Sequence, residues 1–74
     1  MIHAVSVLAD RITLWRDSVE SHDFLYADLV GGTPEEKALD MKDQIATWLD
    51  GKDAEVVLVQ AGPDGKFYPK LRNL

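Results

Sequence analysis

The sequence predicts one small α+β domain, in which a main helix at about residues 34–50 packs on one face of a small antiparallel sheet. Three observations support this fold class: a strong helix start, a β-branched run after the helix, and a turn sequence between the arms of a C-terminal β-hairpin at about residues 55–60 and 66–71. The chain has 74 residues, about half the length of a typical domain. We therefore expect residues 1–74 to form a single domain.

The helix is expected to begin after Thr33, in the sequence Thr-Pro-Glu-Glu. The threonine hydroxyl can cap the first turn, the proline suits the first helical position, and Glu36 completes a capping box. Gly51 predicts the helix end, because glycine tolerates the left-handed conformation that follows a last helical turn. Residues three and four apart give this helix one apolar side, which consists of Ala38, Met41, Ile45, Trp48 and Leu49.

The segment after the helix predicts a β-hairpin. Residues 56–59 are Val-Val-Leu-Val, a run that is apolar on both faces and suits a central strand. Residues 62–65 are Gly-Pro-Asp-Gly, which is strong turn chemistry. Pro69 interrupts the second arm, and since proline cannot donate to a strand ladder, we expect that arm to be an edge strand.

The first third of the chain fits either a hairpin or a helix. Apolar residues recur there at helical spacing, at Val5, Leu8, Ile12, Trp15 and Val19. The density of β-branched side chains favours strands at residues 2–8 and 11–16, and the strand at 56–59 needs partners. We favour the strands, although the sequence alone leaves the choice open. Residues 21–32 are also open, between a short capped helix and a strand.

Composition limits the partners and the environment of the chain. A net charge of −5 argues against direct binding to nucleic-acid backbones, which needs a basic surface. No apolar run approaches the roughly 20 residues that span a bilayer, and the first residues lack the features of an export signal. We therefore expect a cytoplasmic protein without membrane contact. The chain has no cysteine, hence no disulfide to stabilise so short a fold, which makes a homodimer one hypothesis.

The sequence contains no recognisable motif for catalysis, a cofactor or a metal. Glu20, Ser21, His22 and Asp23 include the residue types of a charge relay, but neighbouring residues seldom aim their side chains at a common point. The same segment offers one nitrogen ligand and two carboxylates at a spacing that matches no metal signature. We therefore predict that the protein is not an enzyme and binds neither a cofactor nor a metal.

The outward side of the expected helix carries an acidic stripe, which consists of Glu36, Asp40, Asp43 and Asp50. Glu36 and Asp40 form a like-charged pair four residues apart, which costs the helix roughly 0.2–0.5 kcal/mol. Asp50 lies at the negative end of the helix dipole, where a carboxylate is unfavourable by roughly 0.3–1 kcal/mol. A solvated polar face is the commoner explanation of such a stripe. These costs nevertheless point to a role in binding a basic partner surface, either by electrostatic steering or by mimicry of nucleic-acid phosphates.

The C-terminal end carries a second candidate surface. Lys66, Lys70 and Arg72 follow the turn without any acidic residue, so this end of the chain is basic. Tyr68 points away from Phe67 in an alternating strand and is the best candidate for an exposed aromatic anchor. We take Tyr68, Lys70 and Arg72 as the second set of candidate partner-binding residues.

The passage into the helix resembles the strand-to-helix passage of HicB-like antitoxins, at Leu29, Gly31, Thr33, Glu35, Glu36 and Ala38. The strand that separates the glycine from the threonine in that family is missing from this sequence. No function is carried over from the resemblance, and an antitoxin-like regulator is kept only as an alternative.

Taken together, these features predict a small acidic module that binds a protein partner. An inhibitor or accessory protein of a phage or mobile element, directed against host defence, suits the size and the charge. A structural homo-oligomer without a ligand is the second hypothesis. A small enzyme that uses His22 is the third.

Overall fold

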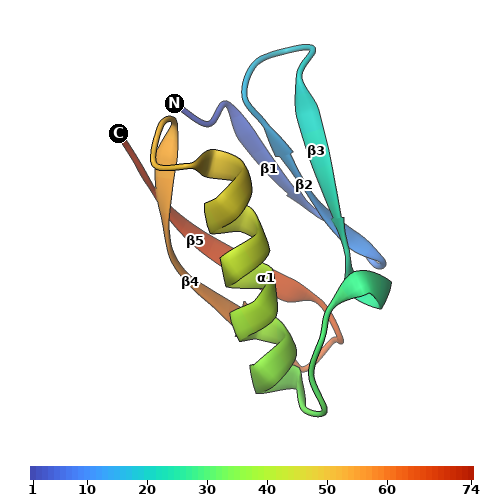
Figure 1. Ribbon diagram of the computed structural model, residues 1–74. Coiled ribbons are helices and arrows are strands. Elements are labelled where there is room, and N and C mark those ends of the chain that lie inside the picture. Colours follow the sequence, from blue (N-terminus) through green and yellow to red (C-terminus); the bar gives the residue numbers. More distant parts are fainter.

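The computed structural model describes residues 1–74 and confirms the α+β fold class (Figure 1). The main helix and the C-terminal hairpin lie where the sequence predicts them, within two residues at each end. The elements in chain order are β1 Ala4–Val7, β2 Arg11–Trp15, β3 Ser21–Leu25, the short 3₁₀ helix η1 Tyr26–Asp28, α1 Pro34–Leu49, β4 Ala54–Ala61 and β5 Phe67–Asn73.

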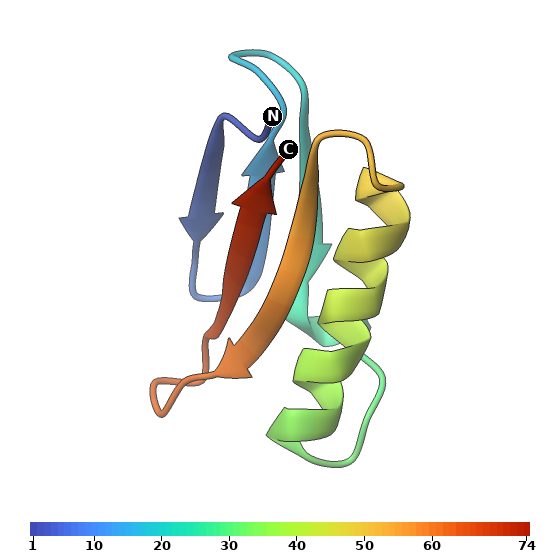
Figure 2. The same cartoon turned by 90° about the vertical axis from the view of Figure 1, so that its left-hand side faces the viewer.

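The strands divide into two antiparallel sheets. β1, β2 and β3 form one sheet in that order, and β4 pairs with β5 in the other. The two sheets lie face to face, and α1 covers the opening between β4 and β3 (Figure 1, Figure 2). The helix packs along β4 and touches β3 at only a few positions. It therefore closes one side of a small two-sheet sandwich and leaves space on its β3 flank.

The N-terminal third forms a hairpin. β1 pairs with β2 in antiparallel register. Ile12 and Leu14 are fully buried, as the two-residue alternation of a strand requires. Val5 and Leu8, which share the helical spacing of Ile12, remain 40% and 45% exposed. The helical period in this segment is therefore incidental, and strand pairing decides the local structure.

Helix α1 begins at the N-cap and ends at the left-handed residues that the sequence predicts, but the Glu36 side chain does not return the hydrogen bond that would complete the capping box. Thr33 is the N-cap, and its hydroxyl accepts the N–H of Glu36 at 3.1 Å. At the other end Asp50 and Gly51 both adopt left-handed conformations, with φ of 51° and 68°. The helix therefore stops at Leu49. Its buried stripe consists of Ala38, Met41, Ile45 and Leu49.

A bulge in β4 decides which of its side chains reach the core. Pairing with β5 shifts by one residue between Val56 and Leu58, so Val57 has no partner of its own. An extra residue of this kind reverses the inward and outward alternation of a strand. Val56 and Val59 are consequently both buried, whereas an uninterrupted strand would turn Leu58 inward. The apolar run at 56–59 thus serves both faces of the hairpin.

The core lies between the two sheets and the inner side of α1. The only buried polar residue of the chain, Thr13, lies on the outer face of β2, where its hydroxyl donates to the carboxylate of Asp23. The apolar members of the core are Ile2, Ile12, Leu14, Phe24, Leu29, Ala38, Met41, Ile45, Leu49, Ala54, Val56, Val59 and Phe67.

Truncation of a core side chain of α1 tests this assignment of helix sides. We expect Ile45→Ala to lower the free energy of unfolding by about 2–5 kcal/mol, because it removes buried methyl and methylene groups and leaves a cavity. Leu39 is 64% exposed on the same helix, so the control Leu39→Ala is expected to change that free energy by no more than about 0.5 kcal/mol. Urea unfolding followed by circular dichroism measures both. Equal losses for the two variants would contradict the packing of α1.

Candidate functional site

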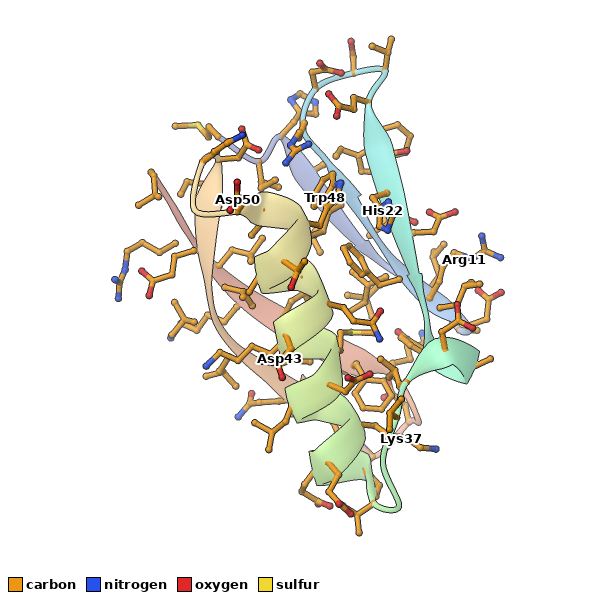
Figure 3. All side chains as sticks on the ribbon, in the orientation of Figure 1. Arg11, His22, Lys37, Asp43, Trp48 and Asp50 are labelled. Carbon is orange, nitrogen blue, oxygen red and sulfur yellow. The ribbon has the colours of Figure 1, made fainter.

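The acidic stripe of α1 lies on the outside of the molecule, but its four carboxylates differ in their surroundings. Glu36, Asp43 and Asp50 are exposed, whereas Asp40 is half-buried. Figure 3 shows Asp43 on the side of α1 that is turned away from the sheets and Asp50 at the C-terminal end of the helix, where it follows the last helical residue in a left-handed conformation. Asp50 lies 3.7 Å from the ammonium of Lys52. The ion pairs of the chain leave Glu36 and Asp43 without a cation.

Asp40 holds the loop that precedes its own helix. One of its carboxylate oxygens accepts the N–H of Val30 at 3.0 Å and the side-chain amide of Gln44 at 2.8 Å. The same loop requires glycine at position 31. At Gly31 φ is 150°, and an added Cβ would lie 2.8 Å from the Cβ of Glu36. Loop structure is therefore sufficient to explain the carboxylate of Asp40.

The second candidate set shares the outward face of β5. Tyr68, Lys70 and Arg72 alternate with more buried neighbours along the strand, and Tyr68 is 41% exposed. Two of the three side chains form hydrogen bonds with other side chains of the same chain. The Tyr68 hydroxyl donates to the carboxylate of Asp64, and Arg72 donates to Glu55 at 3.0 Å. Because β4 lies between β5 and α1, the structure does not bring this set together with the acidic stripe.

A cluster of aromatic rings occupies the space between β3 and α1. Trp48 stacks on His22 with ring centroids 5.5 Å apart, and it meets Phe24 edge-on at 5.9 Å. His22 and Phe24 contact each other at 4.7 Å. In Figure 3 the side chains of Trp48 and His22 lie next to each other between the helix and the strand. Trp48 is half-buried, so part of its surface faces solvent.

A groove of about 460 Å³ opens beside these rings, and we call it the β3–α1 groove. The groove is shallow and widely open to solvent. Sequence reasoning placed Trp48 in the core and missed the groove, because the distance between a strand and a helix is a tertiary property. The groove is lined by His22, Phe24, Asp43, Gln44, Thr47 and Trp48.

Arg16 fixes the helix end of the groove. Its guanidinium lies 4.2 Å from the centre of the Trp48 ring and donates to the Trp48 carbonyl at 2.9 Å. It also donates to the carboxylates of Asp53 and Glu20. The hydrogen bond with Asp53 is the main cause that raises the pKa of Arg16 above its ordinary value. The cation is thus held by contacts within the chain.

Strand alternation separates the residues of the 20–23 segment. His22 turns toward Trp48 on the inner face of β3, whereas Asp23 bonds to Thr13 on the other face. Glu20 is held by Arg16 at 3.2 Å. The geometry therefore does not assemble a charge relay from these neighbours. No group of three or more histidine, cysteine, aspartate or glutamate side chains lies close enough together to hold a metal ion.

Asp23 links β3 to β2 on the outer face of their sheet. Its carboxylate accepts the Thr13 hydroxyl at 2.7 Å and a guanidinium N–H of Arg11 at 3.0 Å. The hydrogen bond from Thr13, followed by the pairing with Arg11, holds the pKa of Asp23 below its ordinary value of 3.8. These contacts keep β3 in register with β2 and so position one wall of the groove.

No family model, no curated protein and no solved structure matches this chain. The resemblance to HicB-like antitoxins therefore stands on the residues of the strand-to-helix passage alone. None of the helices combines the length and the apolar character that crossing a bilayer requires.

The carboxylate of Asp23 makes stability depend on pH in the acid range. A carboxylate whose pKa is lower in the folded state contributes stability that is present above its unfolded pKa and is lost as pH falls through the folded pKa. We therefore expect Asp23→Asn to be less stable than the unmodified chain at neutral pH. The difference is expected to shrink as pH falls below the ordinary value of 3.8.

Urea unfolding at a series of pH values measures this difference. Asp28→Asn is the control, because Asp28 is exposed and makes no ion pair. A deficit of Asp23→Asn that stays constant from neutral pH into strong acid would contradict the role of the Asp23 carboxylate.

Proposed function

We propose that the chain is a non-enzymatic protein-binding module whose exposed helix face engages a basic surface on its partner. One observation carries the proposal. Asp43, a carboxylate without a cation, lines the same groove as the partly buried ring of Trp48. Charge and aromatic surface side by side supply the two components of binding, electrostatic steering and apolar contact.

The carboxylates of the chain divide into those that pair with a cation and those that do not, and the second group includes Asp28 as well as Glu36 and Asp43. Asp23, Asp53 and Glu55 pair with arginines. Glu36 and Asp43 do not, although they lie seven residues apart and therefore on nearly the same line of the helix. Their charges make no attractive contact within the fold. This supports a role for them outside the fold, in contact with a partner.

The two kinds of surface have different roles in the proposed binding. Exposed charges raise the rate at which oppositely charged proteins meet, and their effect weakens with salt. Affinity comes mainly from buried aromatic anchors. We assign the first role to Glu36 and Asp43 and the second to Trp48, with Tyr68 as a further anchor if the partner extends to β5.

The biological setting belongs to the same proposal. A cytoplasmic inhibitor or accessory protein of a phage or mobile element, which occupies the basic surface of a nucleic-acid-handling complex, fits the small size and the net charge of −5. An antitoxin-like regulator is an alternative of the same binding class.

A second candidate function is a structural homodimer that pairs through β1. The N–H of Leu8 donates to the carbonyl of Arg11, so alternate residues of β1 direct their backbone groups to the free edge. Val5 and Val7 occupy these positions, and Ala4–Val7 carries no charge that would discourage pairing with a copy. Sedimentation tests this candidate, because a chain that stays monomeric at roughly tens of micromolar does not form a structural dimer.

Neutralising the free carboxylates tests the leading proposal. Glu36→Gln/Asp43→Asn removes two charges from the stripe, and Asp28→Asn/Glu35→Gln makes the same change at other exposed positions. Partners are captured from a lysate of the source organism with each protein, and their association rates are then measured at increasing salt. We expect the stripe variant to associate about tenfold or more slowly, and the control to behave like the unmodified chain.

The design separates the stripe from net charge, since both variants change the net charge equally. Identical capture and identical rates for the two variants would overturn the proposal that the stripe engages the partner. An association rate that does not depend on salt would do the same.

A further inference from the structure

We infer that the free edge of β3 is the docking site for an extended peptide segment of the partner, which joins the sheet as an added strand and fills the β3–α1 groove. The segment carries an apolar side chain toward Trp48 and, two positions away, a lysine or arginine toward Asp43. This inference rests on the proposed function and specifies how the partner is held.

Backbone groups of β3 are unpaired along the groove. The N–H of Tyr26 donates to the carbonyl of Asp10. The backbone N–H and C=O groups of the even-numbered residues of β3 therefore point toward β2. Successive residues of an antiparallel strand direct their backbone groups to opposite sides. The N–H and C=O groups that point to the free edge are consequently those of Ser21, Asp23 and Leu25.

The free edge of β5 is obstructed. The N–H of Phe67 points away from β4 and donates to the Tyr26 hydroxyl at 3.3 Å. Pro69, two residues further on, has no N–H to offer. The side chain of Asn73 accepts the N–H of Ile2 at 3.1 Å, which brings the start of the chain beside the end of this strand. β5 therefore cannot present a continuous row of donors and acceptors.

The remaining edges lack a groove with aromatic walls, because the hollows between α1 and β4, the larger of about 440 Å³, are lined by no aromatic side chain. α1 packs along β4 and occupies the space next to that strand. β1 has a free edge, but no cavity is found beside it. β3 is thus the edge at which unpaired backbone groups and a groove with aromatic walls coincide.

The groove predicts the spacing of side chains in the added segment. Trp48 and Asp43 are five residues apart on α1, which corresponds to about 7.5 Å along the helix axis. Side chains on the same face of a strand are two residues apart, or roughly 7 Å. In an extended segment beside β3, one side chain therefore lies at Trp48, and the side chain two residues away, on the same face, lies at the height of Asp43. The long stem of lysine or arginine reaches across the helix surface to the carboxylate.

The chemistry of the walls selects the occupant. Backbone addition to a sheet edge gives affinity that is largely independent of sequence, and pockets for alternate side chains give specificity. Trp48 and Phe24 offer apolar contact, and Asp43 attracts a cation that no residue of the chain supplies. The favoured occupant is accordingly an extended, basic peptide segment.

Two adjacent lysine substitutions on α1 provide the test. Thr47 lines the β3–α1 groove, whereas its exposed neighbour Ala46 lines the β4 flank of the helix. Thr47→Lys and Ala46→Lys change the charge equally and use a residue that favours helices. The probes are linear peptides selected from a random display library against the intact chain and then synthesised.

We expect Thr47→Lys to weaken peptide binding about tenfold or more, because it fills the groove and repels the basic side chain, and Ala46→Lys to weaken it less than about twofold. Amide hydrogen exchange of the unmodified chain is measured with and without the peptide. The amides of Ser21, Asp23 and Leu25 are expected to exchange about tenfold or more slowly in the complex.

Three results would overturn the inference: no peptide is selected, the two lysine variants bind the peptide equally, or protection appears on other strands and not on β3. These failures differ from a failure of the proposed function. If partner capture still depends on Glu36 and Asp43 while the β3 amides stay unprotected, the helix face binds its partner without an added strand. If partner capture also does not depend on the charges of Glu36 and Asp43, the proposed function fails as well.

Discussion

The guanidinium of Arg16 joins segments that are far apart in the chain, and the shape of the candidate site depends on it. The guanidinium donates a hydrogen bond to the Trp48 carbonyl in the last turn of α1 and another to the carboxylate of Asp53 in the loop before β4. The backbone of Arg16 itself directly follows β2. The Trp48 ring lies against the same cation. Because a planar guanidinium has five donors in a fixed arrangement, one side chain can set the distance and the angle between helix and strand. The width of the β3–α1 groove follows from that arrangement.

Local chemistry accounts for the parts of the fold that the sequence predicts well. The Thr33 cap, the left-handed Gly51 and the turn at 62–65 each act over a few residues, so their signals survive without tertiary information. The first third of the chain has no such signal. Val5, Leu8 and Ile12 share a helical spacing there, and only pairing between distant residues turns the segment into a hairpin.

The candidate site is less predictable than the fold for the same reason. Helical spacing places Glu36 and Asp43 on the outside, where the structure has them exposed. It cannot reveal that the carboxylate of Asp40 accepts a hydrogen bond from the N–H of Val30, ten residues earlier. Nor can it reveal that Trp48, at the margin of the apolar stripe, meets rings from a strand more than twenty residues away. Charge patterns mark a surface, whereas a groove arises only when two elements are positioned against each other.

The bulge at Val57 restricts how the length of this chain can vary. Loss of one residue at the bulge would restore regular alternation and keep both Val56 and Val59 inward. Loss of one residue elsewhere in β4 would turn the side chains between that site and the bulge to the opposite face. The loop at 17–19 is exposed and makes no contact with the core, so an inserted residue there disturbs no alternation. Related sequences should therefore vary in the length of β4 only at the bulge, while differing freely in length between β2 and β3. Gaps in a future alignment then report the position of the bulge without any coordinates.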